Sequence, residues 1–355
     1  MLRVVHIATG QVGSEALRAI LRHPGLELVG LMVNDPAKVG LDAGVLCGLS
    51  PVGVLATDDV GDLLQLRADC LCQCSTWLNG RRRSAAMQEA ATFLAAGVNV
   101  VSVTVPPLVW PDSPSLAGSE LADLRSAADL GQASFFTTGI DPGFATDVLP
   151  LVATSVCSEV ESVRVLEIHD YSSYQDPDVI FAGMGFGRPV EAVPPYLSPA
   201  GGMMDIRRPV LEMLANALHL QLDDIRFHFQ RSPALQRAEY ANGAVIEQGT
   251  ADAHWFVVEG WSAGKRVLTV EHVTRMQASA APEWPQPLGD GSYKILIQGR
   301  PNLTLDFGME NEGDAISGGL TVTGARLVNS IPDVCAAPPG LLSALDVPFT
   351  PRPVA

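Results

Sequence analysis

The feature that most constrains the fold is the alternation of apolar, β-branched runs with amphipathic runs in the first part of the chain. The strand-like runs occupy residues 3–8, 26–33, 52–57, 68–74, 98–105 and 133–139. Helical patterns separate several of them; Leu17, Ile20 and Leu21, for example, fall on one helix face. Strands that alternate with helices predict βαβ units and a parallel sheet with both faces covered.

The pattern changes near Pro142, and a second domain of mixed α/β composition is predicted beyond it. Its strand-like runs lie at residues 161–174, 293–299 and 303–309, with hairpin-like material at 254–276. Helices are expected within residues 203–220 and 320–332, and residues 336–353 are typical of a proline-rich tail. No low-complexity linker separates the two domains, so we expect a tight connection near residue 145.

Composition and charge exclude several classes of protein. The 355 residues suffice for two domains with sizeable cores, since 47% of them are apolar and only 17% are charged. The net charge of −16 argues against nucleic acid and anionic membranes as partners, whose phosphates favour basic surfaces. No apolar run reaches the roughly 18 residues of a membrane span, and no charged leader precedes the first strand. We therefore expect a cytoplasmic protein.

The cysteines predict neither a disulfide framework nor a metal site. Six cysteines in a chain of this length fit a reducing compartment. Cys70, Cys72 and Cys74 alternate along one expected strand, so their side chains share a face. Their spacing matches no common zinc pattern, and we interpret them as small buried hydrophobes. His6 lies inside the first strand, and we expect it to be a core histidine.

The turn after the first strand reads ATGQVG, residues 8–13, and opens the first helix. Compared with the dinucleotide fingerprint G-x-G-x-x-G, it has Ala8 in place of the first glycine and retains Gly10 and Gly13. The N–H groups of a helix N-terminus favour a pyrophosphate, and the turn begins a βαβ series. We therefore predict NAD or NADP as the cofactor. The predicted contacts in this turn are Thr9, Gly10, Gln11, Val12 and Gly13.

Further coenzyme contacts are expected where later strands end. Asp35, about 20 residues beyond the turn, is placed to accept hydrogen bonds from ribose hydroxyls and to disfavour a 2′-phosphate. Asn34 and Lys38 can tolerate that phosphate, so the choice between NAD and NADP stays open with a lean to NAD. Ser75 and Thr76, which follow the fourth strand, complete the predicted set.

Five segments together resemble the 2,4-diaminopentanoate dehydrogenases and the native amine dehydrogenases, whose N-terminal fold is that of dihydrodipicolinate reductase. They are TGIDPGFATDVLPL (138–151), LEIHDYSSY (166–174), MGFG (184–187), YKILIQGRPNL (293–303) and ARLVNSIPDVCAAPPGLL (325–342). The resemblance implies a Rossmann domain at residues 1–145 and a substrate and dimerisation domain at 146–318. It also implies a terminal helix and tail, 319–355, that return to the first domain. The resemblance further implies a homodimer that transfers a hydride between a nicotinamide and the C=O or C=N carbon of a small molecule.

One departure from this family concerns the proton chemistry. The amine-forming members carry a glutamate just after the fifth strand, whereas this chain reads TVPPL, with Pro106 or Pro107 in that place. Proline has no charge and no proton, so it cannot hold an ammonium or act as a general base. Either another carboxylate replaces the glutamate, or the substrate contains a neutral carbonyl or another double bond.

The residues expected to handle protons lie in the segment EIHDYSSY of the pocket that the resemblance implies. His169, Tyr171 and Tyr174 are candidate donors, and Glu167, on the same strand face as His169, could orient it or replace the missing acid. The alternative is that His169 is a surface residue and the tyrosines are pocket wall. Asp141 has a second possible role as a helix N-cap beside Pro142.

The sequence therefore predicts an NAD(P)-dependent oxidoreductase that acts on a small or medium hydrophobic carbonyl compound. Two alternatives stay open: an amine dehydrogenase or imine reductase with a relocated acid, and a non-catalytic NAD(P)-binding sensor. The histidines of the second domain, His228, His254 and His272, show no metal-ligand spacing.

Overall fold

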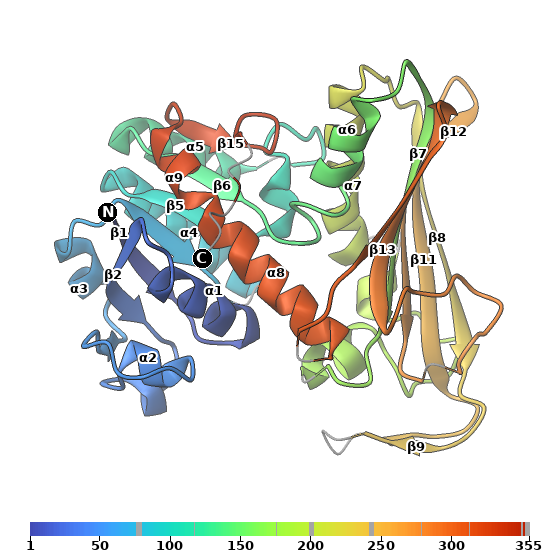
Figure 1. Cartoon of the computed structure of the whole chain (residues 1–355), viewed down its shortest axis with the longest axis horizontal. Helices are drawn as coiled ribbons and strands as arrows, with labels where there is room; N and C mark the ends of the chain where they lie inside the picture. The colour runs from blue at the N-terminus through green and yellow to red at the C-terminus, as the bar shows by residue number, and fades with distance from the viewer. Residues whose placement is uncertain are drawn as a thin grey trace. The chain divides into compact units, whose positions relative to one another are not determined.

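The computed structural model forms two compact units, Met1–Phe144 with Leu320–Ala355, and Ala145–Gly319 (Figure 1). The structure describes residues 1–75, 80–116, 118–174, 176–198, 202–240, 245–277, 279–311, 313–348 and 351. For residues 80–82 and 120 it describes the backbone alone. Unit 1 is built on a parallel sheet, and unit 2 is built on a sheet that contains both parallel and antiparallel strand pairs.

Unit 1 is built on a seven-stranded sheet in the order β15-β6-β5-β4-β1-β2-β3, and each neighbouring pair is parallel. The strands are β1 (Leu2–Ile7), β2 (Leu26–Met32), β3 (Ala56–Thr57), β4 (Cys70–Gln73), β5 (Asn99–Ser102), β6 (Ser134–Thr137) and β15 (Gly340–Leu342). The strand order reverses between β1 and β4, which is where doubly wound sheets bind ligands. The predicted Rossmann-type sheet is confirmed, although the run at 52–57 contributes only two strand residues.

Helices cover both faces of this sheet. They are α1 (Gln11–Leu21), α2 (Ala43–Leu46), α3 (Val60–Gln65), α4 (Gly80–Ala95) and α5 (Ser119–Gly131), with short turns η1 (Pro36–Lys38) and η2 (Pro106–Val109). One apolar core contains Leu17 and Ile20 of α1, and another contains Phe93 of α4 and Leu124 of α5. Two separate cores are what a sheet buried on both faces requires.

The C-terminal segment returns to unit 1 through α8 (Ala315–Asn329), α9 (Ile331–Ala336) and β15. Leu327, Val328 and Val334 are buried in the same core as Leu17. A Cβ added at Gly324 would lie 2.7 Å from the Ala16 nitrogen, so α8 passes very close to α1. The predicted returning helix is confirmed. The expected proline-rich tail also contains the edge strand β15, which pairs with β6 and was not predicted, because three residues carry no readable periodicity.

Unit 2 contains a six-stranded sheet in the order β14-β13-β7-β12-β11-β8. The strands are β7 (Glu159–Asp170), β8 (Asp224–Pro233), β11 (Ala251–Ser262), β12 (Lys265–Arg275), β13 (Gly291–Arg300) and β14 (Leu303–Gly308). A small ribbon joins β9 (Ala238–Glu239) to β10 (Val245–Ile246), and the helical segments are α6 (Val148–Thr154), η3 (Asp178–Gly183), η4 (Pro195–Leu197) and α7 (Gly202–Ala217). Only the β12–β7 pair is parallel, so the sheet is mixed. The predicted combination of strands and helices in this unit is confirmed.

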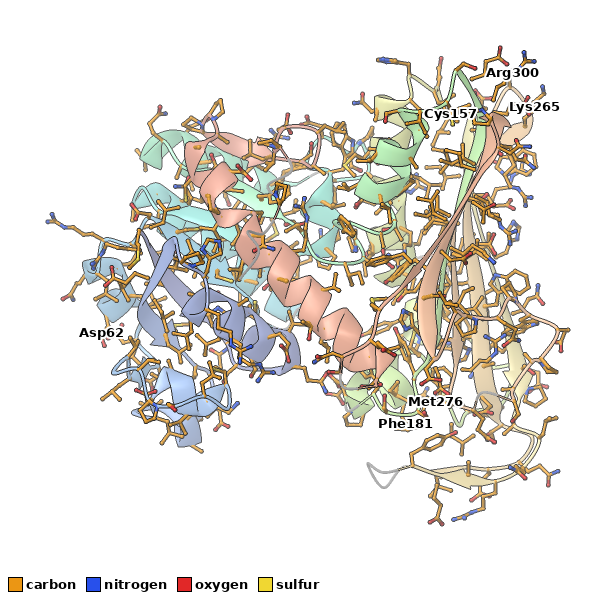
Figure 2. The ribbon with its side chains drawn as sticks, in the orientation of Figure 1. Asp62, Cys157, Phe181, Lys265, Met276 and Arg300 are labelled. Atoms are coloured by element: carbon orange, nitrogen blue, oxygen red, sulfur yellow. The ribbon has the colours of Figure 1, made fainter. Side chains whose placement is uncertain are left out.

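The two ends of the unit 2 sheet can be recognised from the residues at which its strands begin and end. Lys265 begins β12 and Arg300 ends β13 at one end of the sheet, while Met276 follows β12 at the other end, near Phe181 of η3 (Figure 2). The hairpin of β11 and β12 confirms the prediction for residues 254–276. Strand β8 was not predicted; its alternating half-exposed residues place it at the sheet edge.

Candidate active site

The turn between β1 and α1 presents the amide groups of a helix N-terminus. Gly10 is the N-cap of α1 and makes no side-chain cap hydrogen bond, so the first-turn N–H groups remain for another partner. A Cβ added at Gly10 would meet nothing within 4 Å. The space in front of the helix is therefore open, and these residues fit the diphosphate of a dinucleotide.

The other positions of the turn explain why it takes this shape. A Cβ at Gly13 would lie 2.2 Å from the Ala8 carbonyl oxygen, so only glycine lets α1 approach β1 this closely. Ala8 occupies the place of the fingerprint's first glycine and has a φ of +76°, in the left-handed region that favours glycine. The predicted contacts Gly10 and Gln11 are exposed, Val12 is half-buried and Thr9 is buried.

The residues that follow β2 reach back toward the turn. Lys38 Nζ donates to the Thr9 carbonyl oxygen at 3.2 Å and lies 3.1 Å from Thr9 Oγ1. Asn34 and Asp35 are exposed, and the Asp35 carboxylate accepts a hydrogen bond from the Ala37 N–H, which caps η1. Lys38 is thus hydrogen-bonded to Thr9 in the turn of residues 8–13, which is called the phosphate turn below after its predicted ligand. The Asp35 carboxylate lies at the surface.

A buried polar network lies at the carboxyl ends of β4 and β5. Gln73 Nε2 donates to Glu89 of α4 at 2.7 Å, and its Oε1 accepts from the Ser102 hydroxyl at 2.9 Å. Burial raises the pKa of Glu89, although the hydrogen bond from Gln73 opposes this shift. A carboxyl with a raised pKa at this edge of the sheet is a candidate for handling a proton. Of the two predicted residues here, Ser75 lies beside Glu89, and Thr76 lies outside the described residues.

The segment after β5 begins with two prolines, in the stretch where the family resemblance implies a glutamate for amine-forming members. Pro106 and Pro107 begin η2 and are buried. Asp141 precedes Pro142 through a cis peptide bond, and the next helix, α6, is capped instead by Asp147, whose carboxylate accepts from the Val148 N–H at 2.6 Å. The alternative prediction that Asp141 is a helix N-cap was wrong, because the chain makes a further turn before α6 begins.

In unit 2, a buried set of polar side chains gathers at the carboxyl end of β7. Glu167 lies opposite His272 of β12, and His169 lies opposite Thr274, so the four side chains share one face of the sheet. Glu167 Oε2 accepts from Arg207 of α7 at 3.1 Å and lies 2.6 Å from His272 Nδ1. His272 Nε2 is hydrogen-bonded to the Thr274 hydroxyl. Glu167, His169, Arg207, His272 and Thr274 are all buried and are called the polar cluster below.

His169 is a buried member of the polar cluster, not the surface residue of the alternative prediction. Burial lowers its pKa, against the raising effect of the Glu167 carboxylate, so the imidazole is neutral at pH 7. No described residue makes a hydrogen bond to its Nδ1. A Cβ at Gly291 would lie 2.1 Å from that atom, so β13 needs glycine here to make room for the ring.

Two tyrosines pack beside these imidazoles. The rings of Tyr171 and Tyr174 stack with centroids 5.1 Å apart, and Tyr171 meets His272 edge-on at 5.9 Å. Burial, reinforced by the Asp176 carboxylate, raises the pKa of Tyr174 to about 12. Tyr174 therefore keeps its phenolic proton throughout the neutral range. The structure brings the predicted residues Glu167, His169, Tyr171 and Tyr174 together, and their catalytic roles stay predictions.

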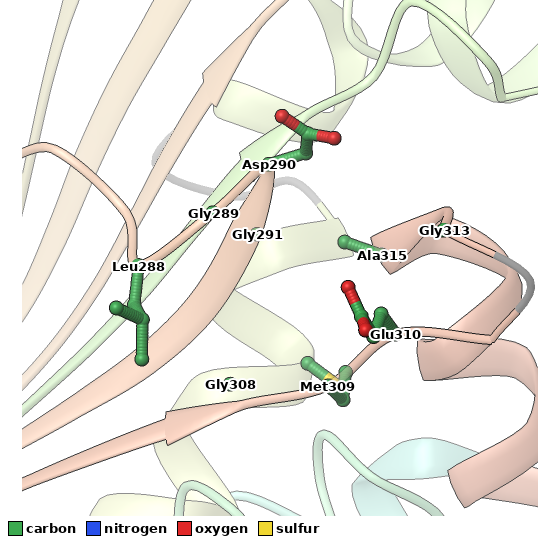
Figure 3. A pocket seen from close by; sticks show the side chains of 9 residues that line it. All are labelled: Leu288, Gly289, Asp290, Gly291, Gly308, Met309, Glu310, Gly313 and Ala315. Atoms are coloured by element: carbon green, nitrogen blue, oxygen red, sulfur yellow. The ribbon is translucent and has the colours of Figure 1, made fainter.

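Two neighbouring cavities lie in unit 2, and His169 of the polar cluster lines the smaller one. The smaller, about 150 Å³, is lined by His169, Asp170, Arg275, Gln286, Pro287, Gly289 and Asp290. The larger, about 450 Å³, shares Gly289 and Asp290 with it and is otherwise lined by Leu288, Gly291, Gly308, Met309, Glu310, Gly313 and Ala315 (Figure 3). The larger cavity has the volume of a site for a small organic molecule. Its wall is mainly apolar and contains two carboxylates, Asp290 and Glu310.

Sequence reasoning missed Arg207, His272 and Glu89. His272 was noted only as one of several scattered histidines, and its position opposite Glu167 depends on a strand pairing that no local pattern shows. Arg207 lies on α7, 40 residues beyond its partner. A signal was present for Arg207, because a charged residue within an apolar helical pattern needs a partner if that face of the helix is buried.

Comparison with known proteins agrees with this architecture. Residues 144–354 match the family of 2,4-diaminopentanoate dehydrogenase C-terminal domains, and residues 3–105 match the dihydrodipicolinate reductase N-terminal family. An amine dehydrogenase of Streptomyces virginiae is 35% identical over 99% of this chain and 97% of its own length. A 4-hydroxy-tetrahydrodipicolinate reductase of Synechocystis is 26% identical over 47% of this chain and 56% of its own length.

Solved structures share the fold. The amine dehydrogenase from Mycobacterium smegmatis superposes with a TM-score of 0.78 at 22% identity, covering 99% of this chain and 97% of that one. GenD2 from gentamicin A biosynthesis, in complex with NAD, gives a TM-score of 0.52 at 13% identity, covering 93% and 86% of the two chains. Among the described helices, none combines the length and apolarity needed to cross a membrane. The chain belongs to the 2,4-diaminopentanoate dehydrogenase and amine dehydrogenase family, and it is an NAD(P)-dependent oxidoreductase.

Proposed function

We propose that this protein transfers a hydride between NAD(P) and a small or medium hydrophobic carbonyl compound, with the corresponding alcohol as the reduced product. Unit 1 would hold the coenzyme at Thr9, Gly10, Gln11, Val12 and Gly13, with Asn34, Asp35, Lys38, Ser75 and Thr76 as further contacts. When bound, the nicotinamide supplies or accepts the hydride. The residues of unit 2 would polarise the oxygen and handle its proton.

The observation that carries the proposal is the charge balance of the polar cluster. Glu167 is buried, but its charge is already compensated by Arg207 at 3.1 Å and shared with His272 at 2.6 Å. A carboxylate that is satisfied in this way has little left to offer an ammonium group. The stretch after β5, where the family resemblance implies an acid for amine-forming members, holds the buried Pro106 and Pro107. A neutral carbonyl substrate suits both features.

The proton chemistry follows from the protonation states in the cluster. Reduction of a carbonyl needs a donor to the oxygen, and Tyr174, whose pKa burial raises to about 12, retains its phenolic proton at neutral pH. Tyr171 stacks on Tyr174 and is the second candidate donor. Oxidation of an alcohol needs a proton acceptor, and the neutral His169 imidazole, whose Nδ1 has no hydrogen-bond partner among the described residues, would provide one. Glu167 would act as a positioning residue, because it holds His272 against Tyr171.

Coenzyme preference would be set beyond β2. The exposed Asp35 carboxylate suits ribose hydroxyls and repels a 2′-phosphate, so we infer a preference for NAD. Lys38 would favour the diphosphate of either coenzyme, because its ammonium is held at Thr9 within the turn.

A second function, dehydrogenation of an amine, is favoured by two observations. Glu89 carries a carboxyl with a raised pKa at the carboxyl edge of the unit 1 sheet, so it could serve as the relocated acid. Asp290 and Glu310 line the larger cavity of unit 2 and suit a cationic group. In this alternative the amine relative from Streptomyces virginiae shares the substrate class as well as the family.

Oxidation of NADH and NADPH over a panel of aliphatic and aromatic ketones, each with and without ammonium, separates these functions. Turnover without ammonium supports the carbonyl proposal. Turnover that depends on ammonium and is abolished in Glu89→Gln overturns it in favour of the amine alternative. Tight coenzyme binding with no turnover would identify a non-catalytic sensor. We further propose the domain division 1–145, 146–318 and 319–355 and a cytoplasmic location. We also propose a homodimer, and sedimentation analysis of the purified chain would check this oligomeric state.

A further inference from the structure

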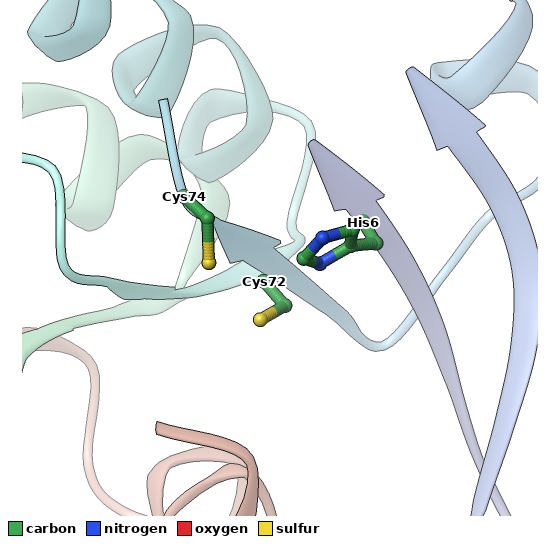
Figure 4. Close-up of side chains that lie close together, drawn as sticks. All are labelled: His6, Cys72 and Cys74. Atoms are coloured by element: carbon green, nitrogen blue, oxygen red, sulfur yellow. The ribbon is translucent and has the colours of Figure 1, made fainter. Parts of the chain in front are cut away.

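Three potential metal ligands gather beneath the phosphate turn of unit 1. His6 of β1 lies directly opposite Cys72 of β4, and Cys74 follows β4, with its N–H donating to the Ile7 carbonyl oxygen at 3.1 Å. One ligand atom of each of His6, Cys72 and Cys74 lies within 4.8 Å of the other two (Figure 4). Neighbouring parallel strands and their shared face bring the three together, although the spacing along the sequence resembles no metal motif.

The hydrogen bonding of His6 prepares one ring nitrogen as a ligand. His6 is fully buried, and its Nε2 lies 2.8 Å from the Ala8 carbonyl oxygen. A carbonyl only accepts, so Nε2 carries the proton and Nδ1 keeps its lone pair. Nδ1 has no hydrogen-bond partner among the described residues. A backbone carbonyl on one nitrogen and a free lone pair on the other is the usual arrangement of a metal-binding histidine.

We propose that His6 Nδ1, Cys72 Sγ and Cys74 Sγ form a binding site for one Zn²⁺-like d¹⁰ cation. Two thiolates and an imidazole suit Zn²⁺ or Cd²⁺ better than hard cations such as Mg²⁺ or Ca²⁺. Zinc bonds of about 2.3 Å to sulfur and 2.0–2.1 Å to nitrogen need only a small closure of the cluster. On binding, the two thiols release their protons and two metal–sulfur bonds form, so the charge of the divalent cation is balanced by two thiolates. Water or a small anion takes the fourth coordination position.

The burial of the site matches a tightly held ion. Cys72 and His6 are fully buried, whereas Cys74 is partly exposed and offers the way in. A Cβ at Gly13 would lie 3.4 Å from the Cys74 Cβ, so the cluster directly underlies the first turn of α1. Cys70 provides a matched control, because it is fully buried on the same strand but lies outside the cluster.

Titration of the reduced, coenzyme-free protein with cadmium chloride tests the site, monitored by thiolate-to-cadmium charge-transfer absorption and by calorimetry. We expect one tight site per chain, at least 100-fold weaker in Cys74→Ala and in Cys72→Ala and unchanged in Cys70→Ala. His6→Gln should also weaken it, with the thiolate absorption retained at high cadmium. Thermal unfolding of each variant without metal shows whether it has folded. Cys74→Ala, at a partly exposed position, keeps the test valid if a buried variant fails to fold.

Two results would overturn the proposal. One is the lack of a saturable 1:1 site in the wild-type protein. The other is tight cadmium binding that survives Cys74→Ala and is lost in Cys70→Ala, which would place the metal on other cysteines. Because the titration contains no coenzyme and no substrate, its failure would leave the proposed oxidoreductase function untouched.

Discussion

The phosphate turn of unit 1 and the polar cluster of unit 2 are built in opposite ways. The turn consists of consecutive residues, 9–13, and would bind the coenzyme through backbone N–H groups whose positions follow from one strand, one glycine turn and one helix. The cluster consists of side chains from β7, β12 and α7, with Glu167 and His272 105 residues apart. The turn therefore depends on backbone shape, and the cluster depends on charge compensation between segments distant in the chain.

This difference implies different sensitivities to mutation. A site made of backbone groups tolerates most side-chain changes, but an added group that occupies the anion's space abolishes binding. A buried ionic cluster loses stability whenever one partner is removed, because the remaining charge has no solvent and no counter-charge. The predictions that follow test this contrast.

The largest effect is expected from Arg207→Met. The substitution leaves the Glu167 carboxylate buried without its guanidinium partner, which costs about 3–5 kcal/mol of stability. Thermal unfolding should show the loss, and adding Glu167→Gln to the variant should restore part of it. Arg208→Met, one residue along α7 at a half-buried position, is the control. Equal losses in the two single variants would show that the ion pair does not hold the cluster.

Coenzyme affinity should respond strongly to Gly10→Asp. The new carboxylate would face the diphosphate in the open space before α1, and repulsion of about 3 kcal/mol corresponds to a roughly 100-fold rise in Kd. Fluorescence titration with NADH measures the change. Gly10→Ala is the matched control, since a Cβ there meets nothing within 4 Å. Normal binding by Gly10→Asp would mean that the diphosphate lies elsewhere.

His169→Gln should lower kcat/KM for alcohol oxidation about 100-fold, the usual contribution of a general base. Burial lowers the pKa of His169, so in the wild-type protein the imidazole is in its neutral, active form at pH 7. It gains a proton and loses activity as the pH falls through the lowered pKa. A pH–rate profile should therefore show an acid limb below the ordinary histidine pKa. The limb should disappear in the variant, and its persistence would assign the base to another residue.

The smallest effect is expected from Lys38→Ala. Because Lys38 binds Thr9 within the turn, its loss should weaken NADH and NADPH alike, by about 5–10-fold or ~1 kcal/mol. Titration with both coenzymes gives the ratio directly. A loss confined to NADPH would show instead that Lys38 contacts the 2′-phosphate.

The same contrast explains what the sequence could predict. The turn and the parallel sheet were predictable because apolar periodicity and glycine spacing are local signals. The return of the terminal helix to unit 1 was predicted only from the family resemblance. His169, Tyr171 and Glu167 were found through their common segment on β7. Their partners Arg207 and His272 were not found, since strand order and register decide which residues meet. Strand β15 was missed because a three-residue edge strand depends on β6 rather than on its own pattern.

The central claim, that a carbonyl carbon receives the hydride and no nitrogen enters the product, can be tested in one incubation. The purified protein would be supplied with a reactive ketone, NADH deuterated at the transferable position and ¹⁵N-labelled ammonium, and the product analysed by mass spectrometry. We expect an alcohol carrying one deuterium at the former carbonyl carbon and no ¹⁵N. An amine product carrying both labels would contradict the account and assign the chain to amine formation.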